Sequence, residues 1–266
     1  MEALKLKSRE AKCSGQWYPY HRSKYEFFDN PLASAVISPH AGFTYSGAVS
    51  LEAVSQVKKK RVWFFGTSHY ERITNGLSIF HGDYNSSLGR TVFPDDLSSN
   101  QSKIISKYLS DEGHRTEEHS IENVLYCLNH FCGEVQAFCG LVSIRDNDTF
   151  EKISDDLAQV WDKDDSIIVS TDWNHFVRTS RIEELMYSVS VLLKTGNIGE
   201  LYHACCRGLY EACGIESLYL AFLLLTKVKE NTKYNILQLT DSSRTAPGER
   251  KRFFSETCVG YIAANN

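Results

Sequence analysis

The sequence contains few prolines, no paired-cysteine motif and no glycine-rich or serine-rich linker. Only five of its 266 residues are proline, and no internal repeat or low-complexity segment divides the chain. These absences predict one domain over residues 1–266. None of the eight cysteines is spaced C-x-x-C, which argues against a zinc ribbon or a thioredoxin-like motif.

Long apolar runs and an excess of positive charge are also absent. The longest apolar run, residues 218–225, is far shorter than the ~20 residues that a membrane-spanning helix needs. The N-terminal residues carry no apolar core of signal-peptide length. The formal net charge is −4, so no overall field attracts nucleic acid. We therefore expect a cytoplasmic protein with mostly free cysteines that neither spans a membrane nor binds nucleic acid.

The sequence does contain short apolar segments that alternate with segments of helical apolar spacing. Strands are predicted over residues 33–38, 61–66, 76–80, 135–143, 166–170, 234–239 and 257–263. Helices are predicted over residues 47–57, 101–111, 118–131, 148–161, 180–194, 198–211 and 215–229. This alternation is typical of an α/β fold with a central, mainly parallel sheet flanked by helices. Strands that are apolar throughout indicate a sheet buried on both faces.

Three predicted strands end in small hydroxylated residues followed by a histidine. "AVISPHAG" ends at His40, "VWFFGTSHY" at His69, and "IIVSTDWNHF" at Asp172 and His175. Ligands of open α/β sheets bind beyond the carboxyl ends of the strands, so these ends would converge on one crevice. Two imidazoles with a third side chain suit zinc, iron, copper or nickel. One such histidine is usually structural, but three ends with one pattern favour a shared functional site.

Three other segments carry side chains of interest, each with a plainer reading. His119 and Glu122 would share a helix face, where the carboxylate orients the imidazole, or they simply begin a helix. Cys213 precedes a long apolar helix, where a thiol has a lowered pKa, although a lone cysteine is more often a small buried hydrophobe. Trp17, in a non-periodic segment, walls a pocket or, more commonly, packs in the core.

Five motifs together resemble a known family. They occur in the order "SPHAGFTYSG" (38–47), "GTSHY" (66–70), "EEHSIE" (117–122), "STDWNH" (170–175) and "ACG" (212–214). In this order they are similar to the motifs of the Memo family, and the resemblance covers nearly the whole chain. It implies a fold similar to the class III extradiol-type non-haem iron dioxygenases.

The resemblance also implies roles for individual residues. It implies a metal site formed by His40, His69 and Cys213, with cysteine where the dioxygenases use glutamate. It places His175 at the acid/base position of a dioxygenase, with Asp172 in the same motif. Four further residues are implied to line or support the crevice: His119, Glu122, Trp17 and Tyr45.

Two functions are compatible with these residues. The first is a mononuclear iron or copper site that supports oxidation–reduction, in which the thiolate shifts the preference toward copper. The second is a non-catalytic adaptor whose crevice binds a phosphotyrosine-bearing peptide or a small anion, as the resemblance permits. Arg178 and Arg181 would then add charged contacts, although an exposed helix start is the more common explanation for them. The sequence favours the first function and leaves enzymatic activity open.

Overall fold

The computed structural model describes residues 7–22, 24, 32–58, 60–247 and 256–266. Within these ranges one sheet contains the strands β1 (Lys7–Arg9), β2 (Ala35–Ser38), β3 (Arg61–Thr67), β4 (Leu77–Ile79), β5 (Gly82–Asn85), β6 (Arg90–Val92), β7 (Glu134–Val142), β8 (Asp165–Ser170), β9 (Trp173–Arg178), β10 (Asn235–Asp241) and β11 (Thr257–Asn265). The helices in the same ranges are α1 (Phe43–Val54), α2 (Ser99–Ile105), α3 (Glu122–Asn129), α4 (Asn147–Ala158), α5 (Thr179–Thr195), α6 (Ile198–Cys206), α7 (Ile215–Lys227) and α8 (Ser242–Thr245). None of these helices combines the length and hydropathy that crossing a membrane requires.

The five central strands of the sheet are parallel, and antiparallel pairs flank them on both sides. Strands β6, β7, β3, β8 and β2 lie side by side in this order and run in the same direction. Phe64 on β3, for example, lies between Cys139 on β7 and Ile168 on β8. Strand β11 runs antiparallel to β2, and β9 and β10 pair with β11. The predicted α/β fold with a mainly parallel sheet is confirmed.

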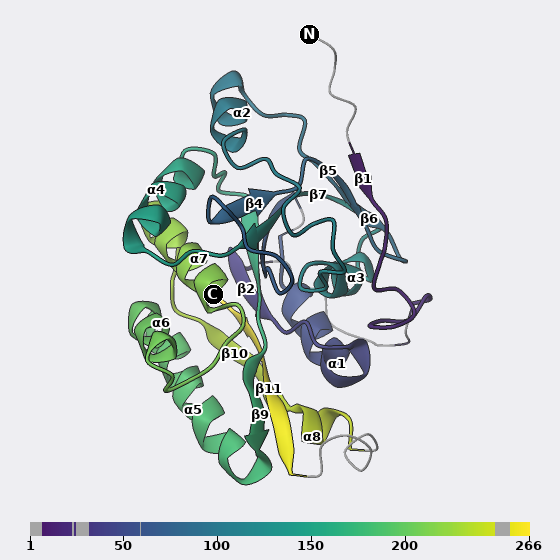
Figure 1. Cartoon of the computed structure of the whole chain (residues 1–266), viewed down its shortest axis with the longest axis vertical. Coiled ribbons are helices and arrows are strands. Elements are labelled where there is room, and N and C mark those ends of the chain that lie inside the picture. The colour runs from purple at the N-terminus through teal and green to yellow at the C-terminus, as the bar shows by residue number, and fades with distance from the viewer. Residues whose placement is uncertain (1–6, 23, 25–31, 59, 248–255) are drawn as a thin grey trace.

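Helices cover both faces of the sheet (Figure 1). On β3, Val62 and Phe64 pack with residues of α1 and α3 on one face. Trp63 and Phe65 pack with residues of α4, α5, α6 and α7 on the other. Burial on both faces explains why the central strands are apolar throughout rather than alternating with polar residues.

Two of the departures from the prediction, near residues 118 and 173, have a clear physical reason. The helix predicted from residue 118 begins only at Glu122, because the carboxylate of Glu118 accepts the backbone N–H groups of His119 and Ser120, both at 2.9 Å. Strand β9 was not predicted, because its residues after Asn174 alternate between partly and fully exposed positions and its pairing depends on β11.

His114 makes stability dependent on pH. Its side chain is buried, its Nε2–H donates to the carbonyl of Ser78 at 2.9 Å, and its Nδ1 has no partner among the described residues. Burial is the main cause that lowers its pKa to about 4, with Arg9 adding to the effect. The unfolded chain therefore binds a proton at higher pH than the folded chain, and stability falls as the pH drops from about 6.5 toward 4.

We expect His114→Gln to reduce this pH dependence. The parent should lose about 1–2 kcal/mol of unfolding free energy through His114 between pH 7 and pH 5, and the variant should lose correspondingly less. Urea unfolding at the two pH values measures the difference. His203→Gln, a change at an exposed histidine of α6, serves as the control. An equal pH dependence in parent and His114→Gln would contradict the prediction.

Candidate metal centre

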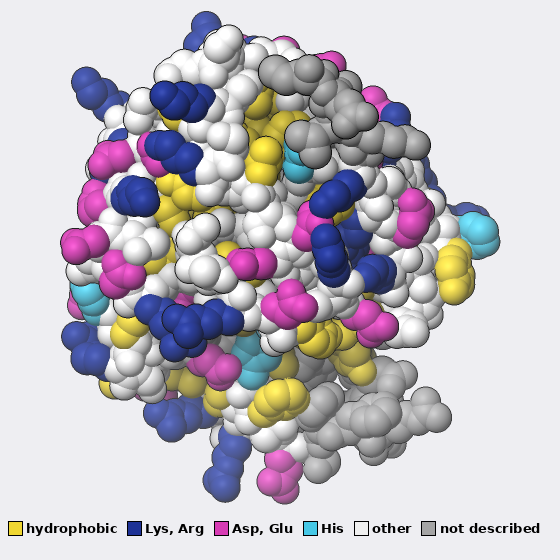
Figure 2. All heavy atoms as spheres, turned by 45° about the horizontal axis from the view of Figure 1, so that its top comes forward, with side chains coloured by type: hydrophobic (Ala, Val, Ile, Leu, Met, Phe, Trp, Pro, Cys, Tyr) yellow, Lys and Arg dark blue, Asp and Glu magenta, His cyan; other side chains and the backbone are white. Residues whose placement is uncertain are grey.

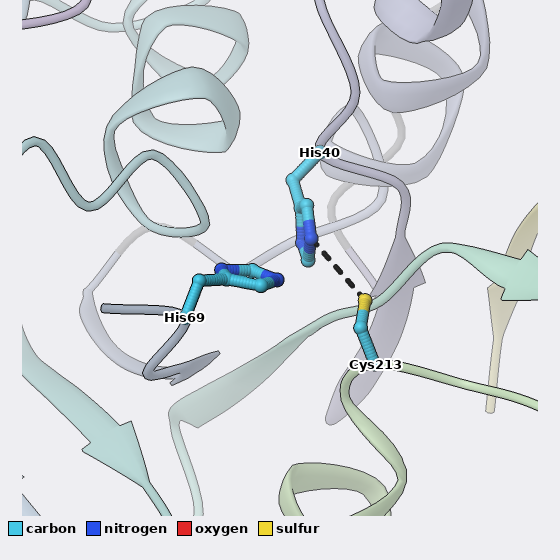
Figure 3. Close-up of side chains that lie close together, drawn as sticks. All are labelled: His40, His69 and Cys213. Atoms are coloured by element: carbon cyan, nitrogen blue, oxygen red, sulfur yellow. Dashed lines mark hydrogen bonds between the residues drawn. The ribbon is translucent and has the colours of Figure 1, made fainter. Parts of the chain in front are cut away.

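Three elements bring His40, His69 and Cys213 together. His40 follows β2 and His69 follows β3, and both strands pair in parallel with β8, so the two histidines lie at the same edge of the sheet. Cys213 precedes α7, and the next residue, Gly214, donates its N–H to the hydroxyl of Thr171 at the end of β8. Figure 3 shows the two rings and the sulfur pointing toward a common space.

The distances between these side chains suit one shared ion. One ligand atom from each of His40, His69 and Cys213 lies within 4.8 Å of the other two. The sulfur of Cys213 is 3.3 Å from Nε2 of His40. The rings of His40 and His69 are nearly perpendicular, at 80°, with their centroids 5.2 Å apart. The three side chains that the family resemblance implied as ligands therefore meet in space.

The Nδ1 atom of each of the two histidine rings already makes a hydrogen bond. The hydroxyl of Ser170 donates to the carbonyl of Ser120 at 2.6 Å and so accepts from Nδ1–H of His40 at 2.7 Å. The carboxylate of Glu118 accepts from Nδ1–H of His69 at 2.9 Å. In both rings Nε2 is therefore the nitrogen left to face an ion, which is the arrangement of histidines that ligate metals.

Burial sets the charges of the site. It lowers the pKa of His40 to about 3, with His69 as a further cause, so the imidazole of His40 is neutral at pH 7. Burial alone would raise the pKa of Glu118, but the hydrogen bonds and charge of His69 outweigh it and lower this pKa to about 2. The carboxylate of Glu118 therefore stays ionised.

The thiol of Cys213 behaves differently from the sequence-based expectation. Burial, and next the charge of Asp172, raise its pKa, so the predicted lowering by a helix N-terminus is wrong for the metal-free chain. The reason is that the thiol is enclosed and faces a carboxyl group. Its sulfur nevertheless accepts the backbone N–H of Asp172 at 3.1 Å. A cation at the site would supply the positive charge that the thiolate requires.

His119 and Trp17 form an aromatic wall beside the three side chains. The ring of His119 is stacked between Trp17, at a centroid distance of 4.0 Å, and His69, at 4.6 Å. Burial lowers the pKa of His119 to about 3. Tyr70, whose side chain is exposed, approaches His119 edge-on at 6.2 Å.

Glu122 and Tyr45 make their contacts outside this stack of rings. The buried carboxylate of Glu122 accepts the backbone N–H of Cys13 and the hydroxyl of Tyr18, both at 2.7 Å, and pairs with Arg9. It does not share a helix face with His119, which precedes α3. Tyr45 packs against the small apolar cluster between α1 and β11.

Asp172 and His175 lie on either side of the start of β9. The carboxyl group of Asp172 accepts the backbone N–H of His40 at 2.9 Å, and burial raises its pKa. His175 places Nδ1 3.2 Å from a carboxylate oxygen of Glu211. Its neighbours Asn174 and Phe176 have φ values of 49° and 56°. Asparagine adopts this left-handed backbone readily, but for the bulky Phe176 it is strained, and such strain often marks functional positions.

Sequence reasoning missed three polar partners of the site. Glu118 was overlooked because the spacing of His119 and Glu122 pointed to the wrong carboxylate, although Glu118 stands in the same "EEHSIE" motif. Ser170 was visible as one of the small hydroxylated strand ends. Glu211 gave no signal, since it lies 36 residues from His175.

These residues fit a single metal ion. Two imidazoles and one thiol form the donor set, and three protein ligands leave positions open, as in catalytic rather than structural sites. A second group, His69, Glu118 and His119, also lies within reach of one ion. The oxygens of Glu118 are, however, already occupied by N–H groups of His69, His119 and Ser120. The first group is therefore the candidate site.

Comparison with known proteins agrees with the geometry. The family model described as Memo-like protein matches residues 9–261. A MEMO1 family protein of Thermoplasma volcanium is 24% identical over 253 residues, which cover 88% of this chain and 91% of the relative. A MEMO1 family protein of Schizosaccharomyces pombe is 27% identical over 193 residues, 64% of this chain and 62% of the relative. The matched residues include every motif discussed above, and the chain belongs to the Memo family.

Proposed function

We propose that the chain binds one iron or copper ion through His40, His69 and Cys213 and supports oxidation–reduction of a small substrate. The observation that carries the proposal is the convergence of two fixed imidazoles and one thiol within 4.8 Å. Iron or copper at such a site supplies one-electron oxidation and reduction. Enzymatic activity is part of the proposal.

The surrounding residues prepare the site for this role. Cys213 loses its proton when a cation binds, and the N–H of Asp172 stabilises the resulting thiolate. The carboxyl group of Asp172 also fixes the loop of His40, because it accepts the backbone N–H of His40. His175 is the residue that holds or moves a proton, because Glu211 engages its Nδ1 and leaves Nε2 for that task.

Metal loading tests the proposal. Protein without a histidine tag is loaded anaerobically with Fe(II) or Cu(I), and we expect elemental analysis to find one equivalent of ion. Electron paramagnetic resonance should show a signal that appears and disappears as the protein is oxidised and reduced. The proposal fails if His40→Ala and His69→Ala bind the ion as tightly as the parent. A bound ion that never changes its oxidation state would exclude the redox role.

The alternative adaptor function has less physical support. With pKa values near 3, His40 and His119 are uncharged at pH 7 and give the metal-free crevice no positive charge for a phosphate. Arg178 and Arg181 are exposed, but no hydrogen bond or ion pair with a described residue holds either side chain toward the crevice. Binding of a phosphotyrosine peptide to metal-free protein, lost in Arg178→Gln with Arg181→Gln, would favour the adaptor.

Glu118→Gln is expected to weaken the metal site without removing a ligand. The amide keeps the shape of the side chain but loses the charge that makes the imidazole of His69 more basic. Loss of such an outer partner usually lowers metal affinity by about 10–100-fold. Competition with a chelator measures the change. Glu117→Gln, at the exposed neighbouring position, is the control, and equal affinities of the two variants would contradict the prediction.

A further inference from the structure

A cavity of about 370 Å³ lies between two loops at the edge of the sheet. One loop, residues 72–76, leads into β4, and the other, residues 143–146, leaves β7. Strands β4 and β7 are antiparallel, with Leu77 opposite Val142, so both loops lie at the same end of the pair. The N–H of Ser143 donates to the carbonyl of Gly76 at 2.8 Å. The first turns of α4 complete the cavity.

Cationic side chains dominate the described lining. It contains Arg72, Lys107, Arg145 and Lys152. Asp146 is the one carboxylate among the described lining residues, and it caps α4 by accepting the N–H and the hydroxyl of Thr149, both at 2.8 Å.

Three of these cations form no direct ion pair, although Glu216 lies near Arg145 and Asp156 lies near Lys152. Lys107 pairs with Asp156 at 2.8 Å, whereas Arg72, Arg145 and Lys152 form no ion pair with a described carboxylate. The chain as a whole has a net charge of −4, so this gathering of positive charge is local. Several unpaired cations around one hollow attract an anion, and guanidinium groups in particular match phosphate oxygens.

The floor of the cavity is apolar. Ile73, Ile144 and Ile153 are buried beneath the charged side chains. Figure 2 shows one face of the molecule, on which lysine and arginine side chains stand beside hydrophobic surface. The volume is in the range of small-molecule sites and exceeds what an inorganic anion alone would fill.

We propose that this cavity binds a small organic phosphate, with the phosphoryl oxygens at Arg72 and Arg145 and the organic part on the isoleucines. None of the three candidate metal ligands lines it, so the site is separate from the metal centre. The loop of residues 72–76 is held in place by two hydrogen bonds. The carboxylate of Glu71 accepts the backbone N–H of Gly113 at 2.8 Å, and the carboxylate of Glu112 accepts the backbone N–H of Thr74 at 2.7 Å. These hydrogen bonds fix the loop that carries Arg72.

Calorimetric titration of the metal-free protein tests this proposal with two probes, inorganic phosphate and phenyl phosphate. We expect one site that binds phenyl phosphate more tightly, with affinities that fall as salt is added. The double variant Arg72→Gln with Arg145→Gln should bind phenyl phosphate at least about tenfold more weakly, since each arginine supplies charge-assisted hydrogen bonds. Arg22→Gln with Arg207→Gln carries the same charge change at exposed positions that do not line the cavity, and should bind like the parent.

Four results would overturn the proposal. They are no binding by the parent, unchanged binding by the first double variant, an equal loss in both double variants, and equal affinity for the two probes. Because Arg72 and Arg145 are exposed, their replacement should leave the circular dichroism spectrum and melting temperature unchanged. Since the titration uses metal-free protein, its outcome is independent of the proposed redox function.

Discussion

Replacement of Cys213 by serine is expected to lower the affinity for Cu(I) or Fe(II) by more than about 100-fold, because loss of an outer partner alone costs about 10–100-fold and this change removes a ligand. The serine hydroxyl does not ionise and is a harder donor than sulfur. Its small size leaves the N–H of Asp172 and the ring of His40 in place. The loss should be larger for Cu(I) than for Fe(II), since thiolate is a soft ligand. Competition with a chelator of known affinity measures both.

Cys206→Ser is the matched control for this prediction. All eight cysteines are free thiols, and Cys206 is exposed at the end of α6. Its replacement makes the same chemical change outside the site and should leave metal affinity at the parental value. If Cys213→Ser retains the parental affinity, the sulfur is not a ligand and the proposed donor set is wrong.

Replacement of Glu122 by alanine is expected to lower the free energy of unfolding by about 3–5 kcal/mol, the usual cost of breaking a buried ion pair. The side chains of Glu122 and Arg9 are 0% and 3% exposed. The change leaves the guanidinium of Arg9 without its counter-charge, and it removes the acceptor of the Cys13 N–H and the Tyr18 hydroxyl. Urea unfolding followed by circular dichroism gives the difference in free energy.

Glu151→Ala provides the comparison for Glu122→Ala. Glu151 on α4 pairs with Lys227 at 2.7 Å, but its side chain is 55% exposed, and exposed pairs contribute about 0–1 kcal/mol. A similar small loss in Glu122→Ala would contradict the prediction. The role of Glu122 is then clear from the contacts it makes: it fixes the N-terminal turn that carries Trp17, and through Trp17 the stack on His119.

The central sheet was predictable because its signals are local. Strands β3 and β8 are apolar at every central position, and both their faces are buried. The histidines that follow β2 and β3 could be assigned to one edge, since parallel strands end together. Short strands such as β5 and β6 were missed because only alternate residues are buried and their neighbours determine the pairing.

The candidate metal ligands could be predicted only in part from the residues themselves. Only its position before a long apolar helix sets Cys213 apart from the other seven cysteines, and the family resemblance supplied its assignment as a ligand. Glu118 was missed because its part depends on a contact with His69, 49 residues away. Such contacts arise only in the folded chain, and they cannot be predicted from the periodicity or the spacing of residues in the sequence.

The single carboxylate of Glu118 has a wider consequence. It accepts four N–H groups, two from His69 and one each from His119 and Ser120, and so fastens the loop after β3 to the segment before α3. The imidazole of His69 is therefore oriented before any ion arrives. Small zinc domains fold only when they acquire their metal. In this chain, removal of the ion should leave the architecture intact and empty the site without unfolding it.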